Sequence, residues 1–245
     1  VVVLAGALAP EVELMRLVPL FLVGVLALAL SGAGAHAADV PLIPRDILFG
    51  NPVKASPQMS PDGTRLSYLA PSDKGVLNVW VRTLGKTDDA QVTNDTYRGI
   101  RMHGWTHDGK HLLYMQDIGG DENFHVYSVD LETKVVRDLT PFQGIRAQGM
   151  ITDKDHPNEL LVGLNLRDRR VFDMYRVDLT TGAIVADTQN PGDVVGWITD
   201  ADFRIRGAMA SNTADGSSIL RVRDAADKPW RDLVTWPFGE NGGGL

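Results

Sequence analysis

The sequence predicts an all-β protein made of β-propeller blades, because one turn-and-strand unit recurs four times along the chain. The unit is clearest at residues 59–69, where Ser-Pro-Asp-Gly precedes an alternating run that ends in Tyr and Leu. In each copy a large apolar residue is followed three residues later by an aspartate. The copies are 45 to 47 residues apart, with the apolar residue at Met59, Trp105, Met150 and Trp197 and the aspartate at Asp62, Asp108, Asp153 and Asp200.

A second repeat supports the first. Alternating strands are expected at residues 78–82, 125–131, 173–179 and 219–224, and their last valines are spaced by 48, 48 and 45 residues. A polar turn follows each of these strands, and short returning runs come after the turns. Three or four short strands in such a period are typical of a propeller blade. We expect four blades in residues 56–236, as part of a propeller of roughly seven or eight blades.

The chemistry of the turn explains where each unit begins. Proline presets φ, aspartate can accept a hydrogen bond from its own backbone, and Gly63 tolerates a positive φ. In the strand that follows, the alternation turns one face toward a core. We therefore interpret the four aspartates as structural, and the four large apolar residues as part of the blade core.

Composition excludes several classes of protein. The 245 residues are 44% hydrophobic and 22% charged, which is ordinary for a globular domain. The formal net charge of −7, without a basic stripe, argues against a nucleic-acid partner. The chain has no cysteine, so disulfides, thiolate metal sites and cysteine nucleophiles are excluded.

The N-terminal region reads as an export signal. Residues 1–14 carry acidic residues unsuited to a signal and are interpreted as a mis-assigned upstream start. In residues 15–37, Arg16 precedes an apolar run of 14 residues and Ala35-His36-Ala37 forms an A-x-A cleavage site. The run is shorter than the ~20 residues that span a membrane, which disfavours a retained anchor. We expect cleavage after Ala37, a periplasmic or secreted protein, and no membrane contact after cleavage.

Two further segments flank the blades. Residues 38–55 form an extended lead-in pinned by prolines, with a short amphipathic piece at 46–49. Residues 237–245 are a glycine-rich tail with no element to build. Since neither segment supplies a closing strand, we expect the chain to be the front part of a longer protein.

Several stretches resemble a known family. They are Ser-Pro-Asp-Gly-Thr-Arg at 60–65, Asn-Val-Trp-Val at 78–81, Gly-Gly-Asp-Glu-Asn-Phe-His-Val-Tyr at 119–127 and Asp-Leu-Thr-Pro-Phe at 138–142. Together they resemble the N-terminal propeller of prolyl oligopeptidase (S9) serine peptidases, in particular the bacterial dipeptidyl aminopeptidase and acylaminoacyl-peptidase branch. The resemblance covers residues 45–236.

This resemblance implies a peptide substrate and a catalytic α/β-hydrolase domain after the propeller, with a Ser–Asp–His triad and a G-x-S-x-G elbow. No serine of this chain lies in such an elbow; the nearest approach, at residues 216–220, lacks the closing glycine. We therefore expect no catalytic residue, no metal and no cofactor in this chain, and no activity from it alone.

The resemblance also suggests substrate-binding candidates. Propeller carboxylates of exopeptidases in this family can hold the free amine of a substrate through a charge-assisted bond, which points to Asp121, Glu122 and Asn123. The alternative is that Asp121 and Asn123 brace the turn before a strand. Arg167, in an Arg-Asp-Arg-Arg cluster, is a further candidate, with an exposed hairpin turn as its alternative.

A histidine series is interpreted as structural. His103, His107 and His111 have a spacing that would suit a metal on a helix, but Gly104 and the Asp-Gly pair at 108–109 forbid that helix. We expect solvated loop histidines.

Three functions compete on these grounds. The first is a propeller that caps an exported S9 peptidase and admits only narrow peptides to its active site. The second is a non-enzymatic periplasmic propeller for protein binding, of the TolB or WD40-like kind. The third is a small four-bladed lectin-like domain that closes on itself.

Overall fold

The computed structural model describes residues 42–240, and the chain divides into a unit ending at Gly50 and a unit beginning at Asn51. The expected upstream start and signal peptide lie outside the described residues. In the first unit, the amphipathic piece is a helix of five residues, α2 (Arg45–Phe49), with no buried side chain. None of the helices in residues 42–240 has the length and apolar character needed to cross a membrane.

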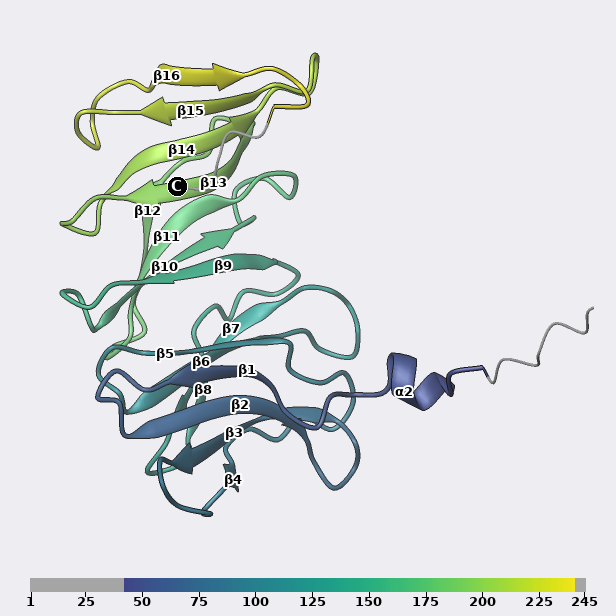
Figure 1. Cartoon of the computed structure of the whole chain (residues 1–245). Helices are drawn as coiled ribbons and strands as arrows, with labels where there is room; N and C mark the ends of the chain where they lie inside the picture. The colour runs from purple at the N-terminus through teal and green to yellow at the C-terminus, as the bar shows by residue number, and fades with distance from the viewer. Residues whose placement is uncertain (1–41, 241–245) are drawn as a thin grey trace, which may run out of the picture. The chain divides into compact units, whose positions relative to one another are not determined.

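The second unit is all-β, as expected, and its described residues form four antiparallel sheets of four strands (Figure 1). The order of the strands in each sheet follows the order in the chain, so each sheet is a meander that corresponds to one blade. The strands are, blade by blade, β1 (Ala55–Met59), β2 (Arg65–Pro71), β3 (Leu77–Thr83) and β4 (Ala90–Gln91); β5 (Met102–Trp105), β6 (His111–Gln116), β7 (His125–Asp130) and β8 (Val136–Asp138); β9 (Ala147–Thr152), β10 (Glu159–Leu164), β11 (Asp173–Asp178) and β12 (Ile184–Thr188); and β13 (Val194–Thr199), β14 (Ile205–Ser211), β15 (Ser218–Val222) and β16 (Arg231–Trp236).

The recurring aspartates are turn residues, and the reason is the same in all four blades. Each accepts a backbone hydrogen bond from the N–H two residues later, at distances of 2.8 to 3.0 Å. In the first turn, hydrogen bonds from Ser60 and Thr64 lower the pKa of Asp62 to about 2. Gly63 and Gly109 close their turns at positive φ, as predicted.

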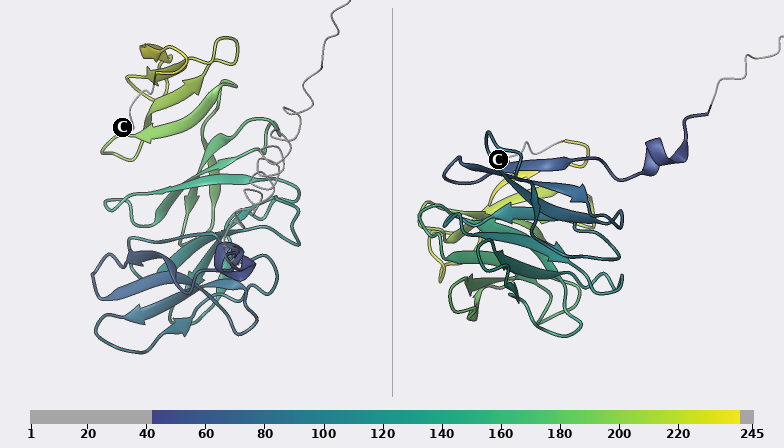
Figure 2. Two further views of the ribbon diagram at one scale, coloured as in Figure 1. Left: turned by 45° about the vertical axis from the view of Figure 1, so that its right-hand side comes forward. Right: turned by 90° about the horizontal axis from the view of Figure 1, so that it is seen from below.

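Apolar side chains pack between consecutive blades. One buried cluster joins the first and second blades through Leu69, Val79 and Leu112. A second joins the second and third blades, for example through Val126 and Leu160. A third cluster joins the third and fourth blades. The left view of Figure 2 shows the blades following one another in chain order. Packing between blades, rather than within one sheet, therefore forms the core.

One prediction about the core is wrong. Trp105 is buried, and Met150 and Trp197 pack against buried clusters, but Met59 is 55% exposed. Trp105 is buried because it packs against the preceding blade. Met59 belongs to the first blade, and residues 51–240 contain no earlier blade that could cover it in the same way. The first blade also carries a polar network in which Tyr68, Arg82 and Lys54 all donate to Asp89.

Candidate functional site

The candidate residues lie on loops at one edge of the blades. In each described blade a loop joins the second strand to the third, and the segment that leads to the next blade ends at the same edge because the strands are antiparallel. The second-to-third-strand loops are residues 72–76, 117–124, 165–172 and 212–217. Contacts join these loops to the linkers between blades, as when Arg169 donates to the Gly144 carbonyl.

Asp121 and Asn123 brace the loop 117–124. Asp121 accepts from the backbone N–H of Asn123 at 3.0 Å and from its side-chain amide at 3.1 Å. It also accepts from the Ile118 N–H at 3.3 Å. These bonds hold the pKa of the Asp121 carboxyl below its ordinary value. The bracing role therefore accounts for both residues in this structure, and a role in amine capture stays a prediction.

Glu122 differs from its neighbours. Its backbone has a positive φ of 59° and its N–H donates to Asp117 Oδ2 at 3.2 Å. The residue is exposed, and no hydrogen bond to its carboxylate is found within residues 42–240. Of the three carboxylate and amide candidates, Glu122 is thus the one whose side chain is available for a ligand.

Arg167 lies on the corresponding loop of the third blade, residues 165–172. Its guanidinium contacts Asp173 twice, at 2.6 and 2.8 Å, and donates to the Asn190 carbonyl at 3.1 Å. Asp173 raises the pKa of Arg167. In the described part of the chain no hydrogen bond or ion pair joins Arg167 to Asp121, Glu122 or Asn123, so the structure does not bring the predicted candidates together in one site.

Two polar hollows open at this edge. The first, which we call the first-junction hollow, has a volume of about 450 Å³ and is lined by Tyr97, Arg98, Gly99, Arg101, Asp117 and Phe124. The other, the third-junction hollow, has a volume of 400 Å³ and is lined by Arg167, Asp168, Arg170, Val171 and residues 189–192. Sequence reasoning missed Arg98 and Arg101. The signal would have been two arginines in a linker whose one acid, Asp95, is adjacent to neither.

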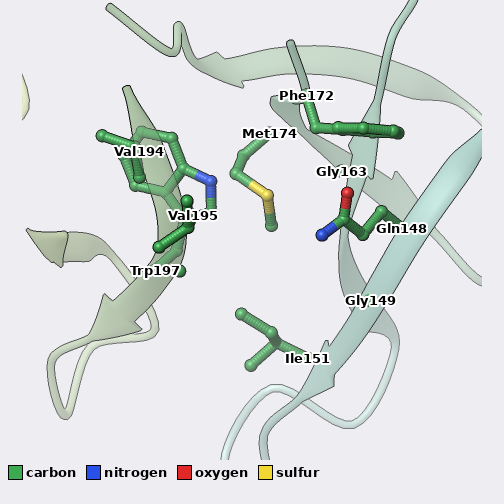
Figure 3. A pocket seen from close by; sticks show the side chains of 10 residues that line it. Gln148, Gly149, Ile151, Gly163, Phe172, Met174, Val194, Val195 and Trp197 are labelled. Carbon is green, nitrogen blue, oxygen red and sulfur yellow. The ribbon is translucent and has the colours of Figure 1, made fainter. Parts of the chain in front are cut away.

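An apolar cavity of about 140 Å³ lies between the third and fourth blades. In Figure 3, Ile151 and Met174 of the third blade face Trp197 and Val194 of the fourth across it. Gln148 brings an amide to the lining, and no charged side chain takes part. This cavity has no group suited to acid–base or nucleophilic chemistry.

The expectation of solvated loop histidines is wrong for His103. It lies on β5 and is buried, with Nε2 at 3.0 Å from Ser67 Oγ. Burial lowers its pKa to about 4. Ser67 is fully buried too, and His103 Nδ1 has no partner among the described residues, so no carboxylate orients the imidazole. The pair is therefore closed to a substrate and lacks the third group that orients a catalytic histidine.

The expectation of a solvated loop residue is also wrong for His111, which is half-buried on the strand β6 between two carboxylates. Its Nδ1 lies 2.8 Å from Asp108 Oδ2 and its Nε2 lies 3.4 Å from Asp130 Oδ2. In residues 42–240 no group of three His, Asp or Glu side chains could hold a metal ion.

Comparison with known proteins tests the resemblance found in the sequence. No protein-family model matches the chain. Over 211 residues, 86% of this chain, it is 42% identical to dipeptidyl aminopeptidase BIII of Pseudoxanthomonas mexicana, of which it covers 30%. The resemblance to the propeller portion of S9 peptidases is confirmed. Because the chain spans less than a third of this S9 relative, the activity of the whole relative is not thereby assigned to it.

Solved structures agree on the fold. A prolyl endopeptidase structure matches with a TM-score of 0.55 and 18% identity, over 74% of this chain and 28% of that one. TolB from Acinetobacter baumannii matches with a TM-score of 0.50 and 17% identity, over 74% of this chain and 43% of that one. At these identities the S9 and TolB likenesses establish a shared propeller architecture only.

Proposed function

We propose that this chain is the propeller portion of an exported S9 serine peptidase, which gates the access of oligopeptides to a catalytic α/β-hydrolase domain encoded further along the same protein. The observation that carries the proposal is the 42% identity to dipeptidyl aminopeptidase BIII, limited to 30% of that protein. In such an arrangement a ring of blades excludes folded protein, and only narrow peptides reach the nucleophile.

The loop edge described above supports a substrate-facing role. It carries the exposed Glu122 and the first-junction hollow, which is lined by two arginines. Carboxylates suit a peptide amine, and guanidiniums suit peptide carboxylates and carbonyls. The opposite edge carries the aspartate turns, whose carboxylates are occupied by backbone N–H groups.

The test begins with the reading frame beyond residue 245. An in-frame G-x-S-x-G motif about one domain further on, followed by hydrolysis of dipeptidyl substrates that is lost when its serine is replaced by alanine, is the expected result. A stop codon with no such motif would overturn the proposal.

A second candidate is a non-enzymatic propeller for protein binding. The match to TolB, which covers 43% of that chain, favours it. Under this alternative the longer gene product would carry no serine elbow, and the purified protein would retain a partner protein on affinity capture without hydrolysing peptides.

A further inference from the structure

The first-junction hollow brings together two guanidiniums and one carboxylate. The linker from β4 to β5 supplies Arg98 and Arg101, and the loop 117–124 supplies Asp117. Both arginines are exposed, whereas Asp117 is buried. The lining side chains therefore carry a net charge of +1.

Neither arginine is strongly paired. Arg98 Nε lies 3.9 Å from Asp117 Oδ2, which is beyond hydrogen-bond distance. Arg101 makes one long contact, from Nη2 to the Arg98 carbonyl at 3.5 Å. In residues 42–240 these are the polar contacts of the two guanidiniums. Since each guanidinium has five N–H donors, most of them remain available to a ligand.

The acidic residues near the hollow do not neutralise Arg98 and Arg101. Asp95 accepts from the backbone N–H groups of Tyr97 and Gly99, and Asp121 is occupied within its own loop. Glu122 is exposed on the same loop but does not line the hollow. Asp117 already accepts from the Glu122 N–H, so its charge is shared between that bond and Arg98.

The loop is shaped to place Arg98. Gly120 has a φ of 88°, and a Cβ there would lie 3.4 Å from Arg98 Nη1. Glycine thus lets the guanidinium lie against the loop. Two aromatic rings complete the lining: Phe124, and Tyr97, which is 73% exposed. A ligand with an anionic group beside an apolar group fits this combination.

We propose that the first-junction hollow binds a peptide carboxylate, with Arg98 and Arg101 as the donors. The planar fork of arginine matches the two oxygens of a carboxylate. A bound carboxylate monoanion would neutralise the net charge of +1 of the lining, whereas a phosphate dianion would leave the filled hollow with a net charge of −1. The carboxylate comes from the C-terminus of a peptide or from an acidic side chain. This inference deepens the proposed function by naming a substrate class, and rests on it for the peptide nature of the ligand.

The test measures binding to the full chain, without any hydrolysis. Three fluorescent, N-acetylated tripeptides serve as probes: one with a free C-terminal carboxylate and no acidic side chain, one C-terminally amidated with a central Glu, and one amidated with a central Gln. We expect at least one of the first two to bind and the third not to bind. Arg98→Gln or Arg101→Gln is expected to weaken binding by about tenfold or more.

Arg170→Gln is the matched control, because it removes the same charge from an arginine at the same edge that already pairs with Asp168. It should change affinity less than about twofold. The two acidic probes distinguish the source of the carboxylate. Each of four results would overturn the proposal: the Gln amide binds as well as the acidic probes, Arg170→Gln loses as much affinity as the Arg98 and Arg101 variants, Arg101→Gln binds as wild type does, or inorganic phosphate competes better than acetate. Such a failure would leave the peptidase assignment to be decided by the serine-elbow test.

Discussion

The arginines of the third-junction hollow are closely paired with carboxylates, whereas those of the first-junction hollow are not. In the third-junction hollow, Arg167 makes two bonds to Asp173, and Arg170 makes two to Asp168. In the first-junction hollow, Arg98 and Arg101 make only long contacts. The same residue type at the same edge is therefore structural in one place and available in the other, and the local supply of carboxylates decides which.

The difference has a plain cause in the chain. The loop 165–172 has its own acid, Asp168, and leads directly into Asp173. In the linker 92–101 the acid is Asp95, whose carboxylate caps the backbone N–H groups of residues 97 and 99. Short-range hydrogen bonds take priority there, because the N–H groups are fixed nearby by the chain itself.

The largest expected effect concerns acid stability at the first junction. Burial lowers the pKa of His103 to about 4 from the ordinary 6.5. The pKa of His103 is therefore lower in the folded than in the unfolded protein, so burying the neutral imidazole costs no protonation energy above pH 6.5. As the pH falls from 6.5 toward about 4, the free energy of unfolding should decrease by about 3 kcal/mol. His103→Gln should remove this part of the pH dependence in urea unfolding.

His107→Gln, in the neighbouring turn, is the control and should keep the wild-type dependence of the free energy of unfolding on pH.

The third junction has no histidine at the equivalent position. His103 lies two residues before Trp105, and the residue two before Trp197 is Val195. Hence the acid-sensitive step should begin with loss of hydrogen-exchange protection in the first two blades. Earlier loss in the last two blades would contradict the comparison.

The next effect concerns the paired arginine of the third-junction hollow. Asp173 is buried and accepts from Arg167 and from the Asn190 N–H. Asp173→Ala removes these bonds and should lower the melting midpoint by about 5 °C. Asp168→Ala, which breaks the more exposed pair with Arg170, should lower it less. Equal values for the two variants would remove the distinction between buried and exposed pairs.

A smaller effect, of opposite sign, is expected from Asp117→Asn. The substitution keeps the shape and an acceptor for the Glu122 N–H but removes the negative charge from the first-junction hollow. Affinity for the carboxylate probe should rise about threefold. Asp121→Asn, on the same loop but outside the lining, provides the comparison in the same titration. Weaker binding in Asp117→Asn would count against a carboxylate ligand.

The smallest effect is on the stability of the Arg98→Gln variant. Since its guanidinium makes no close ion pair within the described residues, the melting midpoint should move by less than about 1 °C. Calorimetry of this variant beside Asp173→Ala provides the check. A fall as large as that of Asp173→Ala would mean that Arg98 is structural too.

The repeat in the sequence predicted the blades and their aspartate turns because both depend on local chemistry. Ser-Pro-Asp-Gly specifies its own turn, and strand alternation needs only neighbouring residues. Exposure was predicted less well. Met59 is exposed because burial depends on a neighbouring blade, and His103 is buried because Ser67 of another strand lies against it. The sequence likewise did not reveal which arginines would find carboxylates. Arg170 pairs with Asp168 inside one loop, whereas Arg98 and Asp117 come from separate segments and stay 3.9 Å apart.

The most direct measurement is nitrogen NMR of the arginine Nε–H groups in the full chain. Arg167 and Arg170 should show the slowed side-chain rotation and protected protons of guanidiniums held by carboxylates, whereas Arg98 and Arg101 should show fast rotation. Adding the acidic tripeptide should shift and slow only Arg98 and Arg101. Fast rotation at all four positions, or shifts at Arg167 and Arg170 instead, would contradict the account.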